Sequence, residues 1–293
     1  VPVPAGPVTA PPLEALTGAD LDALVAANRT VLEAGLAATE VPINLRPSLE
    51  SAVGDRAPIY ADDCVNVGVD AELAPCRYGP ADAATTIVLY GDSHAAQWFP
   101  ALLDVAKSRH SALIVLIKGG CPTAAVPIPT ATLARTCPVW RDAAIDFIAA
   151  ERPQLLVVTA WSDYPNSDDQ WAGGLDLTLG RLRGTATKVV VLGDNPPAQA
   201  LPASCLSGHL HSADACSTDR ADVVPTSRHD AERRAAERNG VAFVDPTDWF
   251  CTDAACPVMI GDILLYRDAT HITTIASSWF APLLGASLAP YLP

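Results

Sequence analysis

Hydrophobic positions from residue 85 onward follow two alternating patterns. Short continuous apolar runs predict strands over 86–90, 112–118, 154–160, 188–192 and 241–244. Stretches with the spacing of amphipathic helices predict helices over 95–108, 138–151, 169–183, 226–239 and 274–289. Strands that are apolar throughout are typical of parallel sheets with helices on both faces. The pattern therefore predicts a three-layer α/β/α sandwich with a mainly parallel, doubly wound sheet.

The N-terminal part of the chain is patterned differently. Residues 1–12 are rich in proline and resemble a linker, and residues 13–38 carry apolar positions at helical spacing, with Thr17 or Asp20 near the helix start. Residues 41–80 show little periodicity and are expected to wrap around a core built elsewhere. We therefore expect a Pro-rich linker and helical extension over 1–57 and an α/β domain over 58–293.

The cysteines form four neighbouring pairs. An even number of cysteines at short spacings predicts four local disulfides and an oxidising, extracytoplasmic compartment; the pairs are Cys64 and Cys76, Cys121 and Cys137, Cys205 and Cys216, and Cys251 and Cys256. Zinc binding is the alternative, and only the loop from Cys205 to Cys216, with His209 and His211, resembles a zinc site. We favour disulfides and expect no metal.

Charge and composition narrow the range of partners. The 293-residue chain has a net charge of -14 and no cluster of basic residues, which argues against nucleic acid as a partner. Scarce lysine beside abundant arginine and alanine is typical of a GC-rich, for example actinobacterial, genome.

No apolar run reaches the roughly 18–20 residues that span a bilayer. Since the N-terminus lacks the pattern of a signal peptide, we expect a domain cut from a longer protein.

The segment Gly91-Asp92-Ser93-His94 ends the first predicted strand and opens a helix. Glycine permits a sharp turn, and the free N–H groups at a helix N-terminus can hold an oxyanion. A serine in this position is therefore a candidate nucleophile. Taken alone, the Gly-Asp-Ser sequence is better explained by Asp92 or Ser93 capping the helix.

A carboxylate and an imidazole lie three residues apart in Asp268-Ala-Thr-His271. A serine nucleophile needs a base, and the base needs an orienting partner. His271 is the best candidate base, because His94 is too close to Ser93 in sequence and the other histidines lie in surface-like contexts: His110, His209, His211 and His229. The two segments together predict a Ser–His–Asp triad.

These motifs, together with Lys118-Gly-Gly-Cys-Pro122 and residues 157–162, resemble the SGNH hydrolases. The chain is most similar to the extracytoplasmic SGNH domains fused to membrane acyltransferases of acyltransferase family three (AT3). The resemblance implies an SGNH catalytic domain over 58–293, with Ser93 as nucleophile, His271 as general base and then acid, and Asp268 orienting the imidazole. It also implies an oxyanion hole built from the backbone N–H groups of Ser93 and Gly120.

One departure from the family pattern bears on activity. SGNH hydrolases carry an oxyanion-binding Asn after the third strand, but this chain reads Thr159-Ala-Trp-Ser-Asp-Tyr164 there. Asn195 follows the fourth predicted strand and is better explained as a turn residue before proline. Losing one oxyanion donor costs about 100- to 1000-fold in rate, so we expect weak hydrolysis. Further candidates, for substrate binding, are Trp161, Ser162, Asp92 and His94.

The resemblance implies an O-acyltransferase, most simply an O-acetyltransferase, that acts on a hydroxyl of a cell-envelope glycan or glycolipid outside the cytoplasmic membrane. A membrane-embedded acyltransferase domain would be its partner, and no cofactor is needed. A secreted carbohydrate esterase or lipase of the same family and a non-catalytic glycan-binding module are the alternatives. Four tryptophans could stack on sugars but are more often core residues: Trp98, Trp140, Trp161 and Trp171.

Overall fold

The computed structural model describes residues 11–293, so most of the predicted linker over 1–12 lies outside the described residues. Its centre is a seven-stranded sheet in the order β1-β4-β3-β5-β6-β8, with β2 also paired to β4. All pairs are parallel except β2 with β4. The bounds are β1 (Val65–Asn66), β2 (Cys76–Tyr78), β3 (Thr86–Gly91), β4 (Ala112–Lys118), β5 (Leu155–Thr159), β6 (Lys188–Leu192) and β8 (Ala242–Val244).

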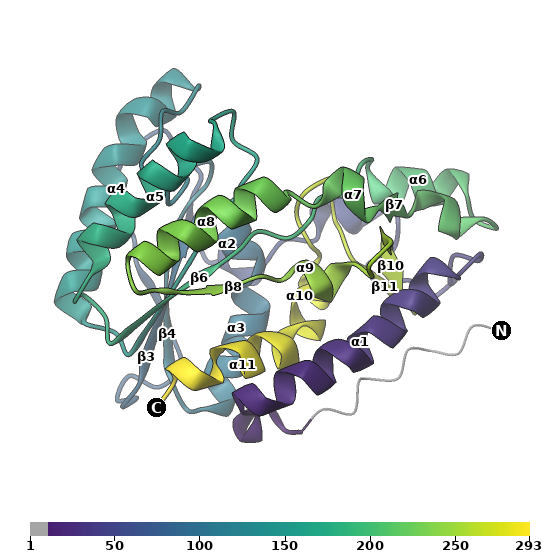
Figure 1. Cartoon of the computed structure of the whole chain (residues 1–293), viewed down its shortest axis with the longest axis horizontal. Coiled ribbons are helices and arrows are strands. Elements are labelled where there is room, and N and C mark those ends of the chain that lie inside the picture. Colours follow the sequence, from purple (N-terminus) through teal and green to yellow (C-terminus); the bar gives the residue numbers. More distant parts are fainter. Residues whose placement is uncertain (1–10) are drawn as a thin grey trace.

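Helices cover both faces of this sheet (Figure 1). One face carries α4 (Ala131–Glu151), α5 (Asp168–Leu182) and α8 (Thr226–Arg238). The other carries α2 (Ser93–Gln97), α3 (Phe99–Ser108), α10 (Thr274–Trp279) and α11 (Ala281–Leu288). Alternate residues of β3 enter the two cores: Ile87 and Leu89 one, Val88 and Tyr90 the other. The predicted three-layer, mainly parallel fold is confirmed.

Smaller elements complete the chain. They are α6 (Pro202–Gly208), α7 (Arg220–Val223), α9 (Thr247–Phe250), β7 (Thr218–Asp219), β9 (Ala255–Cys256), β10 (Met259–Ile260) and β11 (Ile263–Leu264). β7 pairs with β9, and β10 with β11, in two small antiparallel sheets outside the main one. The strands β1 and β2 escaped prediction because two or three residues are too short to show a periodicity.

Two predicted helices are each divided in two, and a third begins early. The helix expected over 95–108 breaks at Trp98, and the one expected over 274–289 breaks at Phe280. In both cases a proline sits in the first turn of the second piece, where its missing N–H costs nothing. Helix α4 starts seven residues before the predicted 138, because Pro138 lies inside the helix rather than at its start.

The end of β3 lies where the chain changes direction across the sheet. β3 pairs with β4 on one side and β5 on the other, so the connections from β3 to β4 and from β4 to β5 run opposite ways. Ligands of doubly wound sheets bind at such a switch point. At this end a Cβ on Gly91 would lie 1.8 Å from the Thr159 carbonyl oxygen, so only glycine allows the two strands to approach.

The N-terminal helix α1 (Leu21–Leu36) packs against the C-terminal helices (Figure 1). Leu24 and Leu32 belong to the same core cluster as β3 and α3. The buried Asn28 donates its amide to the Trp249 carbonyl at 2.9 Å and accepts from the Trp279 indole at 3.2 Å. The helical segment therefore docks on the α/β domain, and a boundary at residue 57 stays a prediction.

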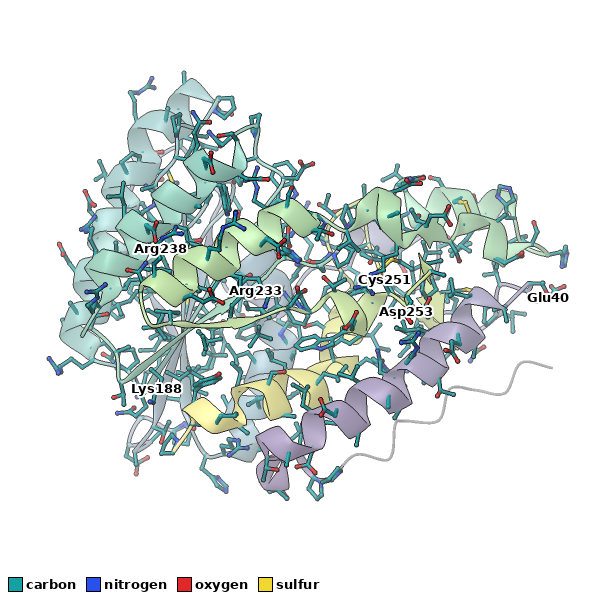
Figure 2. The ribbon with its side chains drawn as sticks, in the orientation of Figure 1. Glu40, Lys188, Arg233, Arg238, Cys251 and Asp253 are labelled. Atoms are coloured by element: carbon teal, nitrogen blue, oxygen red, sulfur yellow. A yellow bond between two sulfur atoms is a disulfide. The ribbon has the colours of Figure 1, made fainter. Side chains whose placement is uncertain are left out.

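All four predicted disulfides form. Their Cα atoms lie 4.1 to 5.8 Å apart (Cys251 is labelled in Figure 2). Because Cys205 and Cys216 are joined in a disulfide, neither offers zinc a thiolate ligand. His209 Nδ1 lies 2.8 Å from the Cys205 carbonyl oxygen. None of the helices in residues 11–293 combines the length and the apolar character that crossing a membrane requires.

Candidate active site

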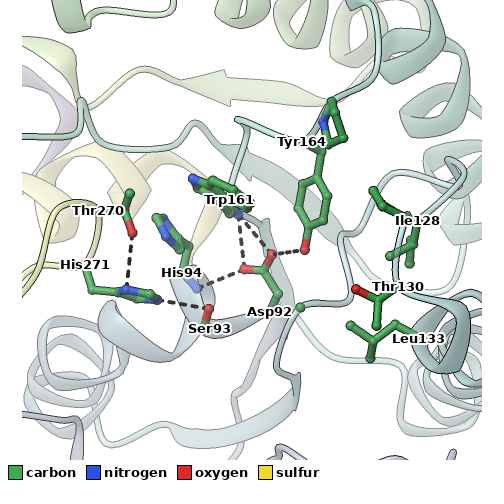
Figure 3. Close-up of a pocket in the computed structure, with 13 residues that line it drawn as sticks. Asp92, Ser93, His94, Ile128, Thr130, Leu133, Trp161, Tyr164, Thr270 and His271 are labelled. Carbon is green, nitrogen blue, oxygen red and sulfur yellow. Dashed lines mark hydrogen bonds between the residues drawn. The ribbon is translucent and has the colours of Figure 1, made fainter. Parts of the chain in front are cut away.

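Ser93, His271 and Asp268 meet at the carboxyl end of β3. Figure 3 shows Ser93 and His271. Ser93 is the first residue of α2, directly after the β3 turn, and His271 lies in the loop before α10. The Ser93 Oγ is 3.0 Å from His271 Nε2, although 178 positions separate them. The Nδ1 of the same ring lies 3.0 Å from Asp268 Oδ2. The arrangement has the geometry of a serine nucleophile, a base and an orienting carboxylate.

The loop 268–271 is folded around its own carboxylate. Asp268 Oδ1 accepts the backbone amides of Thr270 at 2.9 Å and His271 at 2.7 Å. Burial would raise the pKa of Asp268, but its side-chain bond to His271 and these amides outweigh burial and hold that pKa well below its usual range. Asp268 is therefore ionised at neutral pH and fixes the imidazole with Nε2 toward Ser93.

His271 itself is a neutral base at physiological pH. Burial lowers its pKa most, and the positive charges of His94 and Arg267 add to this, while the bond to Asp268 opposes it. The net result is a pKa below the ordinary 6.5. An unprotonated Nε2 beside a hydroxyl is what proton abstraction requires.

The buried side chains of Gln97 and Asn195 form a hydrogen-bonded clamp that contacts the chain on both sides of His271. Gln97, in the same helix as Ser93, accepts the Ile272 amide at 2.8 Å and donates to Asn195 Oδ1 at 2.6 Å. Asn195 in turn donates to the Thr270 carbonyl at 3.0 Å. The residues before and after His271 are thus tied to the Ser93 helix. The turn interpretation of Asn195 missed this contact, and its amide is engaged here rather than free as an oxyanion donor.

Asp92 caps α2 and ties it to the loop that follows β5, beneath the site. Its carboxylate accepts the amides of His94 at 2.9 Å and Trp161 at 3.1 Å, and the Tyr164 hydroxyl at 3.4 Å (Figure 3). Complete burial raises its pKa to about 6. The capping interpretation is therefore correct for Asp92, while Ser93 is left free to face His271.

Two residues of the triad pocket have unpaired backbone amides. Within the described residues, no acceptor pairs with the N–H of Ser93 or of Gly120. Gly120 follows β4 with a positive φ of 69°, lines the same pocket as Ser93, and precedes the Cys121–Cys137 disulfide. The amides of Trp161 and Ser162 are occupied by the carboxylates of Asp92 and Asp194. Neither amide replaces the missing Asn.

A second histidine–aspartate pair lies beside the first. His94 is buried, and its Nδ1 is 2.6 Å from Asp194 Oδ1; the ring centroid lies 4.5 Å from that of His271. Burial lowers the pKa of His94, but the Asp194 carboxylate outweighs it and the net shift is upward. His94 could be singled out from the sequence but its partner could not, because Asp194 lies 100 residues away.

One other sequence interpretation changes, and one is confirmed for three of four residues. His229 is buried rather than surface-like, with Nδ1 3.4 Å from Asp245 in an ion pair away from the triad. Of the four candidate tryptophans, three are core residues with 1 to 2% exposure, namely Trp98, Trp140 and Trp171. Only Trp161 among the four lines the pockets described next.

Two pockets adjoin beside the triad. The first, about 380 Å³, contains Ser93, His271 and Gly120, and apolar side chains form its far wall: Ile128, Pro129, Leu133 and Pro165. The second, about 330 Å³, is polar and contains four aspartates, Asp163, Asp168, Asp194 and Asp222. His94, Trp161 and Thr270 line both. Volumes of this size suit small-molecule sites.

The fold and this geometry define a serine-hydrolase-type site on a doubly wound sheet. Residues 60–286 match the family described as the SGNH domain fused to AT3 domains, and the chain belongs to this family. No curated protein matches the sequence.

Several solved structures are similar to the chain. The periplasmic domain of the Salmonella ser. Paratyphi A lipopolysaccharide acetyltransferase is similar with a TM-score of 0.58 and 14% identity, covering 95% of this chain and 99% of that one. A carbohydrate acetylesterase from Sinorhizobium meliloti has a TM-score of 0.47 and 13% identity, covering 70% and 99%. A GDSL-like lipase from Bacteroides thetaiotaomicron has a TM-score of 0.45 and 13% identity, covering 73% and 92%.

Proposed function

We propose that this protein is a serine-dependent O-acyltransferase that moves a short acyl group, most simply acetyl, onto a hydroxyl of a cell-envelope glycan or glycolipid. The observation that supports it best is the 3.0 Å contact between Ser93 Oγ and a His271 ring oriented by Asp268. A helix cap alone would not require this contact. The geometry therefore favours an enzyme over a glycan-binding module.

In the first half-reaction, His271 Nε2 takes the Ser93 proton as Oγ attacks the carbonyl carbon of the acyl donor. The negative oxygen of the tetrahedral intermediate is held by the N–H groups of Ser93 and Gly120. His271 then gives the proton to the leaving group, and an ester on Ser93 remains.

In the second half-reaction, an acceptor hydroxyl loses its proton to His271 Nε2 while its oxygen attacks the acyl carbon. The bond to Ser93 Oγ breaks, and Oγ recovers the proton from His271. Water follows the same path in hydrolysis. With two backbone donors and no Asn amide in the hole, turnover is expected to be slow for transfer and hydrolysis alike.

The proposal takes its acyl source from a second domain. Because the matched family is fused to AT3 domains, we propose that a membrane-embedded acyltransferase domain supplies the acyl group to Ser93 on the extracytoplasmic side. Four disulfides support that oxidising location.

Acetyl release from p-nitrophenyl acetate tests the proposal. Wild type is compared with Ser93→Ala, His271→Ala and Asp268→Ala, and fluorophosphonate labelling of Ser93 reports nucleophile activation independently of turnover. We expect slow wild-type turnover and background rates for Ser93→Ala and His271→Ala. A wild-type protein that neither turns over nor labels contradicts the proposal.

The alternative in the same family is a secreted carbohydrate esterase or lipase. The two differ in the fate of the acyl-enzyme, so the measured quantity is the ratio of acetyl transferred to a sugar to acetyl released to water. A ratio that does not rise with sugar concentration would assign the protein to the esterases.

A further inference from the structure

We propose that the polar pocket beside the triad is the acceptor subsite, and that it takes an uncharged sugar through neighbouring hydroxyl groups. This inference rests on the proposed function and names its acceptor class. The pocket is built by the ends of β5 and β6 and by the segment from Asp222 to Arg228. It lies next to the triad pocket and shares His94, Trp161 and Thr270 with it.

The position of the oxyanion hole assigns the two pockets to different substrates. Gly120 and Leu133 line only the first pocket, so the acyl oxygen and the apolar donor group point that way. The acceptor must approach from the side of His271, which takes its proton. His271 lines the first pocket, and its neighbours Thr270 and His94 line both, so an acceptor in the second pocket would reach His271 past these two residues.

A buried polar group points to a ligand at the junction. The His94 side chain is 2% exposed, and its Nδ1 is held by Asp194. No described residue pairs with its Nε2, and the ring lines both pockets. Because Nε2 opens onto the pockets and has no protein partner, a ligand hydroxyl or a water can supply one. Nε2 is thus placed to bond a hydroxyl next to the one that reacts.

Charge selects the class of sugar. Four aspartates line the pocket: Asp163, Asp168, Asp194 and Asp222. Two of them are paired with cations, Asp168 with Arg228 at 2.8 Å and Asp194 with His94 at 2.6 Å, which leaves Asp163 and Asp222 without an ion pair among the described residues. Carboxylates accept hydrogen bonds from sugar hydroxyls but repel uronic acids and phosphorylated sugars. Trp161, which is half-buried at the junction, offers an apolar surface to the ring of the sugar.

The test measures transfer of acetyl from p-nitrophenyl acetate to methyl glucoside and to the matching methyl glucuronide. We expect the neutral sugar to accept acetyl at least about tenfold better, because like charges in the pocket oppose the glucuronide. Asp222→Trp fills the mouth of the pocket and should lower the ratio of transfer to hydrolysis at least about tenfold. Asp219→Trp is the control, since Asp219 is also exposed but lies outside the pocket.

A second variant avoids a bulky side chain. Asp163→Asn combined with Asp222→Asn removes two of the charges while keeping side-chain size, and should narrow the preference for glucoside over glucuronide. Both positions are exposed, so folding should be preserved.

The outcomes separate the two proposals. If wild type hydrolyses the ester and transfers acetyl to sugar, and Asp222→Trp has the same ratio of transfer to hydrolysis as Asp219→Trp, the acceptor pocket is overturned. The acyltransferase proposal then stands. Equal use of glucoside and glucuronide overturns the charge argument. Hydrolysis without transfer to either sugar overturns the subsite and favours an esterase, and a wild-type protein without turnover or labelling overturns both proposals.

Discussion

The clamp between Gln97 and Asn195 makes a strong prediction, because it joins the Ser93 helix to the His271 loop through two buried side chains. Gln97→Ala removes the acceptor of the Ile272 amide and the donor to Asn195, contacts of 2.8 and 2.6 Å. Leaving a buried polar group unpaired costs about 1–3 kcal/mol, so the variant should lose roughly 2–5 kcal/mol of stability. That corresponds to a fall in Tm of about 5–15 °C for a domain of this size.

Activity should fall further than stability alone explains. A displacement of about 1 Å at a catalytic base costs on the order of 100-fold in rate, so kcat for p-nitrophenyl acetate should drop by about that factor with a smaller change in KM. Both quantities are measured well below Tm, where all variants are folded. The rate of fluorophosphonate labelling should fall in parallel with kcat.

Asn28→Ala is the matched control. Asn28 is also buried and also makes two hydrogen bonds, to Trp249 and from Trp279, but on α1, in the packing between α1 and the C-terminal helices. It should lose similar stability and keep its kcat. If Gln97→Ala and Asn28→Ala lose stability equally and both retain wild-type kcat, the clamp does not position His271 and the reasoning is refuted.

Three further predictions concern pH, burial and backbone contact. The kcat/KM for ester hydrolysis should rise with pH along a limb below the ordinary 6.5 of histidine and be flat at pH 7–8, because the active base is neutral His271 and its pKa is lowered; a limb centred above 7 would contradict this. Burial raises the pKa of Glu232 to about 7, so the stability that its protonated form contributes is complete below about pH 4.5 and lost as pH rises through 7. Glu232→Gln can still accept the hydrogen bond from Trp171. The free energy of unfolding in urea should therefore rise by about 1–3 kcal/mol in this variant at pH 8 and stay unchanged at pH 4.5. Gly91→Ala should abolish soluble expression or cost more than about 3 kcal/mol, because its Cβ meets the Thr159 carbonyl, whereas Gly173→Ala, in an open position of α5, should be neutral or slightly stabilising in thermal unfolding.

The local pattern of apolar residues along the chain was enough to predict the layers of the fold. A buried strand such as β4, apolar over seven residues, is predictable because both of its faces are covered. The four disulfides were predictable for a related reason, since each joins cysteines no more than 16 residues apart. Helix breaks were harder to place. Pro100 and Pro282 end one helix and start the next, while Pro138 is tolerated inside α4, and packing rather than local sequence decides which occurs.

The sequence by itself determined the candidate chemistry: a serine after a glycine turn, and a carboxylate three residues before an imidazole. Each is a local motif, and a local motif indicates only the structure of the few residues that form it. The tertiary structure decided which groups surround them. It paired His94 with Asp194, tied Gln97 to Asn195, buried His229, and left Trp161 at the junction of two pockets. Such contacts link residues about 100 positions apart, and they form only when the sheet brings the ends of its strands to one edge.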